Sequence, residues 1–195
     1  MSILYLVRHG RTSTSPLDPS NPGLSPAGRE QALAVAQELS ARLLRPIAIL
    51  ASPLSRCRET AEALCDLWGQ APLLEPRVAE IPAPDGPSLR RDEWLRTTLA
   101  LSWSEVAREG ERIERGYSMR VSQWRKGVCE AALACRTDTV IFSHFVPINV
   151  LAGEALNQQT VTCFQPDYAS VTIFETMGDR IRLVERGREG HSRPV

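Results

Sequence analysis

Short apolar runs along the chain mark the positions where we expect β-strands. Most of these runs show little alternation of polar and apolar residues, which is typical of strands that are covered on both faces. The strands are expected at residues 3–7, 47–51, 77–81, 139–143, 170–175 and 180–185. Only a short turn around Gly178 separates the last two, so these two strands are expected to form a hairpin.

Between the strands, apolar residues recur every three or four positions, which predicts amphipathic helices. The first helix is expected to be capped by Ser25 and to have Pro26 in its first turn. Ser52 and Pro53 are expected to open the second helix in the same way. The helices are expected at residues 26–44, 53–68, 117–135 and 146–156.

Two proline-rich segments interrupt this alternation and predict loops. Residues 13–24 and 81–87 contain three prolines each, and proline removes a backbone donor. The charged, tryptophan-containing stretch 88–115 predicts short helices of an insertion. Alternating strands and helices indicate an α/β fold: a three-layer α/β/α sandwich with a mostly parallel central sheet. The length of 195 residues favours a single domain, 1–195, with a small helical lid around 84–115.

The charge balance narrows the partners that the chain is expected to bind. Its formal net charge is zero, which argues against a general nucleic-acid or membrane-surface binder. Of its 23 basic residues, only Lys126 is not an arginine. No apolar run approaches the ~18 residues that a membrane span needs. Because the N-terminal residues resemble a strand more than a signal peptide, we expect a cytoplasmic protein.

Cysteine and histidine are too sparse and too scattered to predict a metal site. The chain has five cysteines with no C-x-x-C pair, and its three histidines are His9, His144 and His191. His191 lies in the C-terminal tail, where we expect a surface role. We therefore expect no metal and no other cofactor, and cysteines that serve mainly in packing.

Polar residues follow several of the predicted strands directly. Residues 8–12, R-H-G-R-T, end the first strand, and Arg56 or Arg58 falls in the first turn after the second. Glu80 lies in the segment 77–81, and His144 follows the strand 139–143. In a parallel sheet these groups meet at one edge, because functional groups collect at the carboxyl ends of strands. Arginines clustered with histidines indicate a binding site for a phosphate dianion.

Five segments, in this order along the chain, resemble signatures of the histidine phosphatase superfamily, which includes the cofactor-dependent phosphoglycerate mutases. They are L-V-R-H-G-R-T (6–12), L-S-P-A-G-R-E-Q-A (24–32), S-P-L-S-R-C-R-E-T-A (52–61), A-E-I (79–81) and S-H-F (143–145). The resemblance implies that His9 attacks the phosphorus and is transiently phosphorylated, with His144 stabilising the transferred group. It implies that Glu80 protonates the departing alkoxide and then activates water. The residues expected to bind the phosphoryl group are Arg8, Arg11, Thr12 and Arg56.

Two departures from the family pattern leave questions open. Phe145 and Val146 follow the second histidine, where many members have glycine. After Glu80, the chain has I-P-A-P-D-G in place of the F/L-G-x-W-E-G of many members, so Asp85 is a rival for the role of general acid. Both departures border the substrate pocket and bear on substrate identity.

The resemblance favours a metal-independent phosphomonoesterase that acts on small phosphorylated metabolites. The short 88–115 insertion and the absence of the mutase-like loop pattern after R-H-G disfavour a mutase. The alternatives are a phosphoglycerate mutase, a phosphohistidine protein phosphatase or a non-catalytic phosphate-binding module. We expect no nucleic-acid or membrane partner, and a homodimer through strand edges is compatible with the pattern.

Overall fold

The computed structural model describes residues 1–13, 21–86 and 90–190, so His191 and parts of the predicted loops and tail lie outside the described residues. The elements in chain order are β1 (Ser2–Arg8), α1 (Pro26–Arg42), β2 (Ala48–Ala51), α2 (Ser55–Trp68), β3 (Leu73–Leu74), the 3₁₀ helix η1 (Pro76–Val78), α3 (Arg91–Thr98), α4 (Trp103–Ile113), α5 (Tyr117–Ala134), β4 (Thr139–Ser143), α6 (Phe145–Leu156), β5 (Val171–Met177) and β6 (Arg180–Glu185).

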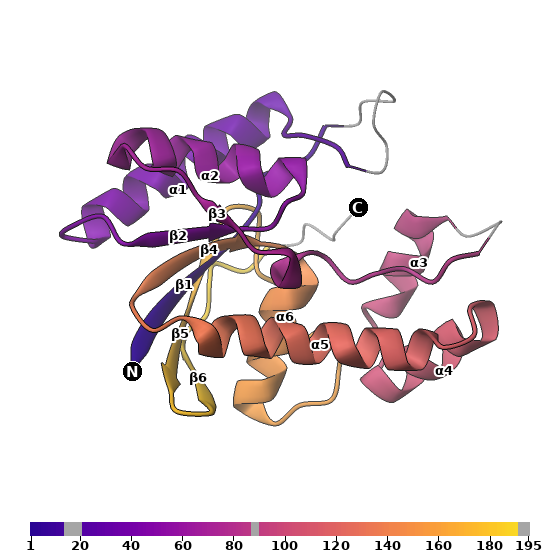
Figure 1. The fold of residues 1–195 in the computed structure, drawn as a ribbon. Coiled ribbons are helices and arrows are strands. Elements are labelled where there is room, and N and C mark those ends of the chain that lie inside the picture. Colours follow the sequence, from indigo (N-terminus) through magenta and orange to yellow (C-terminus); the bar gives the residue numbers. More distant parts are fainter. Residues whose placement is uncertain (14–20, 87–89, 191–195) are drawn as a thin grey trace.

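The described strands form one sheet in the order β3-β2-β4-β1-β5-β6 (Figure 1). The first four strands in this order are parallel, while β5 is antiparallel to β1 and β6 is antiparallel to β5. β1 therefore lies in the middle of the sheet, with Leu6 paired to Ile141 of β4 and to Thr172 of β5. The predicted mostly parallel sheet and its C-terminal hairpin are confirmed.

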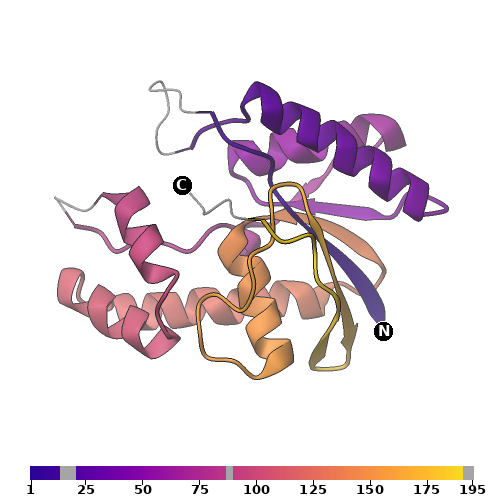
Figure 2. The same ribbon diagram turned by 180° about the vertical axis from the view of Figure 1, so that it is seen from behind.

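Helices cover both faces of the sheet, which confirms the predicted three-layer sandwich (Figures 1 and 2). The helices α1 and α2 pack on one face, and their buried side chains include Val35, Ala36, Leu39, Ala61 and Leu64. The helices α5 and α6 pack on the other, and theirs include Val121, Val128, Ile148, Val150 and Leu151. Two apolar cores, one on each side of the sheet, thus hold the strand ends in place. Among the described residues, no helix is both long enough and apolar enough to cross a membrane.

Two predicted boundaries are wrong, and both matter for the site. α2 begins at Ser55, later than the predicted residue 53, and its N-cap residue Leu54 makes no side-chain capping bond. The predicted strand 77–81 is instead a 3₁₀ turn followed by irregular chain, while the true edge strand β3 precedes it. Pro76 supplies no donor for a sheet ladder, so the chain turns there. The strand β3 consists of only two residues, Leu73 and Leu74, which is too short an apolar run to predict a strand.

The insertion between β3 and α5 forms its own small helical layer beside the main sandwich, at one end of α5 (Figure 1). Trp94 of α3 packs edge to face on Tyr117, with ring centroids 6.3 Å apart, and Trp103 of α4 lies 6.2 Å from Trp124. Both insertion tryptophans are buried, as expected for packing residues. Gly110 makes this packing possible, because a Cβ there would lie 2.0 Å from the Tyr117 ring.

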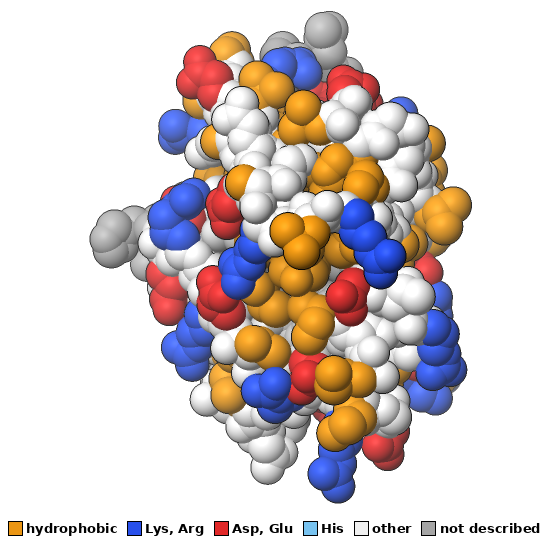
Figure 3. Space-filling model, turned by 90° about the vertical axis from the view of Figure 1, so that its left-hand side faces the viewer, with side chains coloured by type: hydrophobic (Ala, Val, Ile, Leu, Met, Phe, Trp, Pro, Cys, Tyr) orange, Lys and Arg blue, Asp and Glu red, His pale blue; other side chains and the backbone are white. Residues whose placement is uncertain are grey.

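On the face of the molecule where the parallel strands begin, apolar side chains gather in the middle, with charged side chains around them (Figure 3). At one edge of the sheet, the two residues of β3 are largely exposed, Leu73 by 69% and Leu74 by 54%. A homodimer through such an edge stays a prediction.

Candidate active site

The histidines predicted from the sequence lie side by side at the carboxyl ends of two neighbouring strands. Arg8 of β1 pairs with Ser143 of β4, and the backbone N–H of His9 donates to the Ser143 carbonyl at 3.0 Å. His144 is the next residue after β4, so its ring meets that of His9 with centroids 5.2 Å apart. The parallel register of β1 and β4 thus builds the pair directly.

His9 is held in one tautomer and kept neutral. Its Nδ1 lies 2.8 Å from the carbonyl oxygen of Gly10, which can only accept, so Nδ1 carries the proton. The lone pair then resides on Nε2. Burial lowers the pKa of His9 well below its ordinary value, and the charges of Arg56 and Arg8 lower it further. The imidazole is therefore neutral at physiological pH.

His144 is fully buried, and contacts at its Nε2 atom hold the ring. Its Nε2 lies 2.8 Å from the Ser52 hydroxyl and 3.3 Å from the thiol of Cys57. The Ser52 oxygen accepts from the backbone N–H of Leu54 at 3.4 Å, and the Cys57 thiol donates to the Ser143 carbonyl at 3.2 Å. These contacts fix the orientation of the His144 ring. Burial, and next the charge of Arg56, lower the pKa of His144 well below its ordinary value.

Arg8 is a fully buried cation within an aromatic and carbonyl cage. Its guanidinium carbon lies 3.9 Å from the centre of the Tyr168 ring and 5.3 Å from that of Phe145, and Nη1 donates to the Pro166 carbonyl at 2.9 Å. Burial lowers the pKa of Arg8, but an arginine stays charged under these conditions. Phe145, which stands where many family members have glycine, therefore packs against the Arg8 guanidinium and helps to hold it in position.

Arg56 enters the same cluster from the first turn of α2 and is only 8% exposed. Its carbonyl accepts a hydrogen bond from the Thr60 hydroxyl at 2.6 Å, and Thr60 in turn accepts from the backbone N–H of Gly10 at 3.0 Å. This relay joins α2 to the loop that carries His9. Because α2 begins here, its helix dipole adds partial positive charge near Arg56.

Glu80 is the carboxylic acid that the structure brings to the cluster. It is 7% exposed, and its Oε1 accepts from the backbone N–H of Ile81 at 3.0 Å. Burial raises the pKa of Glu80, while Arg56 and Arg91 oppose the rise. Asp85, the rival from the sequence, is exposed, and its N–H donates to Glu114 on the insertion.

The irregular chain after η1, which carries Glu80, is fixed against α5. The Tyr117 hydroxyl donates to the Pro82 carbonyl at 2.9 Å, and Arg120 donates to the Ala83 carbonyl at 3.0 Å. Side-chain hydrogen bonds from α5, and not pairing in the sheet, thus hold this segment and position the carboxyl group of Glu80.

Arg11 and Thr12 lie at the edge of the site and outside its buried group. The Arg11 side chain is exposed, while its backbone N–H donates to Gln31 at 2.8 Å and its carbonyl accepts from the N–H of Ser25 at 2.9 Å. Thr12 forms an isolated bridge with Leu24. Both residues fasten the start of α1, and their contacts with a phosphoryl group stay predictions.

Sequence reasoning missed four side chains that shape the site. Ser52 was expected to cap a helix and Cys57 to be one of the packing cysteines, whereas both contact His144. Thr60 had no signal apart from its place in the family segment. Tyr168 comes from an irregular loop before β5, with no periodic pattern to mark it.

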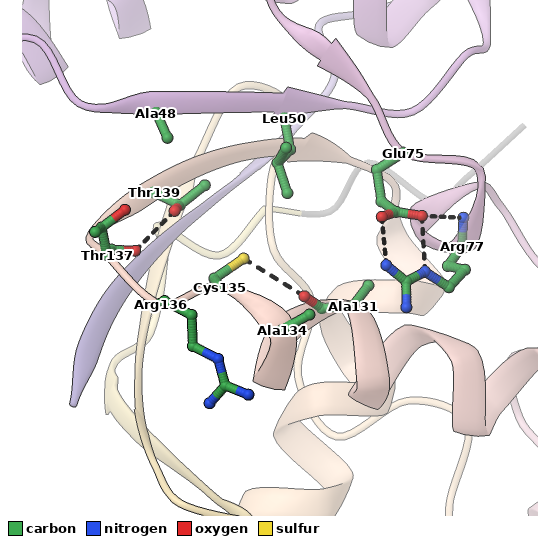
Figure 4. A pocket seen from close by; sticks show the side chains of 10 residues that line it. All are labelled: Ala48, Leu50, Glu75, Arg77, Ala131, Ala134, Cys135, Arg136, Thr137 and Thr139. Atoms are coloured by element: carbon green, nitrogen blue, oxygen red, sulfur yellow. Dashed lines mark hydrogen bonds and ion pairs between the residues drawn. The ribbon is translucent and has the colours of Figure 1, made fainter.

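A separate pocket of about 280 Å³ lies at the opposite end of the strands and contains none of these residues (Figure 4). It is lined by the beginnings of β2 and β4 and by the end of α5, with the Glu75–Arg77 ion pair at one side. In the part of the chain that the structure describes, no group of three or more His, Cys, Asp or Glu side chains could hold a metal ion.

Comparison with known proteins decides the family. The model of the histidine phosphatase superfamily (branch 1) matches residues 4–188. The chain belongs to this superfamily. Two curated relatives of this histidine phosphatase are both named probable phosphoglycerate mutase GpmB. The protein from Erwinia tasmaniensis is 29% identical and that from Photorhabdus laumondii 31%, and each match covers 78% of this chain and 74% of the relative.

Solved structures show the same fold. A phosphoserine phosphatase from Entamoeba histolytica, solved in complex with 3-phosphoglyceric acid, matches with a TM-score of 0.71 and 22% identity. The match covers 98% of this chain and 99% of that one. Phosphatases and mutase-like proteins thus share this architecture, and the fold itself does not separate the two activities.

Proposed function

We propose that this histidine phosphatase hydrolyses small phosphorylated metabolites through a phosphohistidine on His9, without a metal ion or other cofactor. The observation that carries the proposal is the pair of buried histidines, each held in place by hydrogen bonds and kept neutral between Arg8 and Arg56. The positive charge of the two arginines suits a phosphoryl dianion. A cytoplasmic location belongs to the same proposal.

In the first step, Nε2 of His9 forms a bond to phosphorus while the ester P–O bond breaks. Glu80 gives its proton to the departing alkoxide, a role that the raised pKa of this buried carboxyl supports. Arg8, Arg56 and His144 stabilise the negative charge on the phosphoryl oxygens, because positioning and electrostatics supply most of the catalysis in phosphoryl transfer.

In the second step, water attacks the phosphohistidine. The Glu80 carboxylate takes a proton from that water, the P–N bond breaks, and inorganic phosphate leaves with Glu80 protonated again. Nε2 of His9 regains its lone pair. The cycle closes with no change in the protein and consumes one water for each ester. The helices α3 and α4 are proposed to form a lid over this site, which favours small substrates over protein segments.

A phosphoglycerate mutase is the second candidate, because both curated relatives carry that name. A mutase would return the phosphoryl group from His9 to a second hydroxyl of the substrate instead of losing it to water. The two candidates share His9 and differ in the acceptor. Formation of inorganic phosphate therefore separates them.

The test is phosphate release from a panel of small phosphomonoesters, with a chelator present, by wild type and by His9→Ala. We expect turnover that the chelator does not affect and that His9→Ala abolishes. Isomerised phosphoglycerate without free phosphate would indicate the mutase, and release only from a phosphohistidine protein would indicate a protein phosphatase. A folded protein that binds phosphate but releases none from any ester would be a binding module.

The acid role is tested by Glu80→Gln, with Asp85→Asn as the matched control. General acid catalysis contributes about 10²–10⁴-fold, so Glu80→Gln is expected to slow hydrolysis of an alkyl phosphate by that order. Hydrolysis of p-nitrophenyl phosphate should suffer less, because its leaving group needs no proton. Equal effects of the two substitutions would remove Glu80 from the role.

A further inference from the structure

Gly10 directly follows His9 and is packed too tightly for any other residue. A Cβ at this position would lie 2.5 Å from the carbonyl oxygen of Gly28, in the first turn of α1. The close approach therefore requires glycine, the residue that restrains its own backbone least. The carbonyl oxygen of Gly10 is also the acceptor that holds Nδ1 of His9. The orientation of the imidazole thus depends on whatever fixes the backbone of this glycine.

Two side chains, one from α1 and one from α2, hold the peptide groups on either side of Gly10. On one side, the backbone N–H of Gly10 donates to the Thr60 hydroxyl of α2 at 3.0 Å. On the other, the backbone N–H of Arg11 donates to the amide oxygen of Gln31 on α1 at 2.8 Å. That N–H belongs to the same peptide group as the Gly10 carbonyl. A chain of hydrogen bonds thus runs from Gln31 through one peptide group to Nδ1 of His9, and the bonds of such a chain strengthen one another.

The Thr60 side chain is itself fixed. It is fully buried, and its hydroxyl donates to the Arg56 carbonyl at 2.6 Å. A hydroxyl has only one hydrogen, so the Thr60 oxygen is left to accept from Gly10. Gln31 is half-buried. Both side chains thus reach His9 through the backbone of Gly10.

We propose that Thr60 and Gln31 are positioning residues for His9. They fix the Gly10 carbonyl, which keeps the imidazole proton on Nδ1 and the lone pair on Nε2, where the proposed reaction needs it. When either contact is lost, the glycine backbone can rotate. Part of the population then carries the proton on Nε2 and cannot attack phosphorus. The inference rests on the proposed function and deepens the role given there to His9.

The first test compares Thr60→Val, which keeps the shape without the hydroxyl, with Thr60→Ser, which keeps the hydroxyl. A small misplacement of a reacting group can cost about a hundredfold, and Gln31 still holds one peptide group, so kcat of Thr60→Val is expected to fall about ten- to a hundredfold. Thr60→Ser is expected to retain most of the activity. Thr139→Val is the matched control, because it removes another buried hydroxyl that donates to a carbonyl at 2.8 Å, at the opposite end of the sheet.

The second test removes the acceptor of the other peptide group with Gln31→Leu. The expected fall in kcat is of the same order, about ten- to a hundredfold, because the Gly10 carbonyl loses its fixed direction. Gln37→Leu changes an exposed glutamine of the same helix and is expected to leave kcat unchanged. Because Thr60 and Gln31 hold the same glycine, the double variant is expected to lose more than the product of the two single losses.

The affinity for inorganic phosphate separates a positioning role from a general disturbance of the site. Other contacts hold Arg8, among them the Tyr168 ring and the Pro166 carbonyl. The inhibition constant of phosphate is therefore expected to change little in Thr60→Val and Gln31→Leu while kcat falls. An equal loss of phosphate affinity and kcat would show that the substitutions disturb the whole site, and it would overturn the inference.

Nitrogen NMR of the imidazole rings reads the tautomer without any turnover. The chain has three histidines, so comparison with His9→Ala assigns the signals of His9. Wild type is expected to show a protonated Nδ1 and an unprotonated Nε2, whereas Thr60→Val and Gln31→Leu are expected to show a mixture of tautomers. A wild-type His9 spectrum in both variants would refute the inference. If wild type hydrolyses no ester, the proposed function falls, and these spectra decide the inference alone.

Discussion

Ser52→Ala is the substitution that tests how His144 is held. The hydroxyl is fully buried and lies 2.8 Å from Nε2, so its loss leaves that nitrogen with the Cys57 sulfur, 3.3 Å away, whose own hydrogen is donated to the Ser143 carbonyl. A buried polar atom without its partner costs about 1–3 kcal/mol, which we expect as the loss in free energy of unfolding. The imidazole also loses a contact that fixes its orientation, so its ring N–H is no longer held toward the phosphoryl oxygens of the proposed substrate.

Loss of one such donor at a developing oxyanion costs about 10²–10³-fold, and the remaining contact with Cys57 sets the expected fall in kcat/KM at the lower end of that range. Hydrolysis of a good substrate and urea unfolding measure the two effects. Ser55→Ala is the control, because that hydroxyl lies in the same turn and bonds to Asn21. A loss of stability with unchanged kcat/KM would refute the role of Ser52 in orienting His144. A double variant with Cys57→Ala should lose more than the sum of the single losses, because both groups serve one nitrogen.

Other substitutions and conditions probe the rest of the site. Tyr168→Leu removes the ring that Arg8 lies over, a contact worth about 2 kcal/mol when desolvated, so the inhibition constant of phosphate should rise about tenfold or more. Tyr168→Phe keeps the ring and should keep most of the affinity for phosphate. An unchanged inhibition constant in Tyr168→Leu would show that the ring does not support Arg8. The pKa of folded His9 lies well below 6.5, so as the pH falls the unfolded chain binds a proton at His9 before the folded protein does. The free energy of unfolding should therefore be higher at pH 7.5 than at pH 5.5. Urea unfolding of wild type and His9→Ala at these two pH values should show a part of this difference that depends on His9. The raised pKa of Glu80 should set the alkaline decline of kcat/KM, which Glu80→Gln should abolish. Burial raises the pKa of the Cys57 thiol, so iodoacetamide should label it only in urea, and rapid labelling of folded protein would exclude the packing described.

The sheet was predictable because its strands are buried on both faces. The apolar runs around Leu6 and Ile141 have no polar alternation, and parallel strands follow from the helices between them. Leu73 and Leu74 could not be recognised as a strand, because they form only two edge pairs and are exposed. Around Val78, the apolar run reflects a buried side chain on a turn, which hydrophobicity alone does not distinguish from a strand.

Those residues of the site that directly follow a strand could be predicted from the sequence. His9 and His144 directly follow β1 and β4, so their meeting depends only on strand direction and order. The contacts of Ser52, Cys57 and Tyr168 depend on how side chains orient across two layers of packing, and no local pattern carries that information. Which carboxyl group joins the cluster likewise depended on the side-chain bonds that hold the segment of Glu80 against α5.

The central position of β1 has a consequence for how the protein comes to fold. Leu4 pairs with Thr139 on one side and with Phe174 on the other, so the middle of the sheet joins segments that are far apart in the chain. Closing such long loops carries an entropic cost before any pairing rewards it, and such topologies fold slowly. During synthesis, β1 leaves the ribosome long before its partners exist, and its apolar residues must wait unpaired. The candidate site, which needs β4 beside β1, can therefore form only late in synthesis, after residue 144 has left the ribosome.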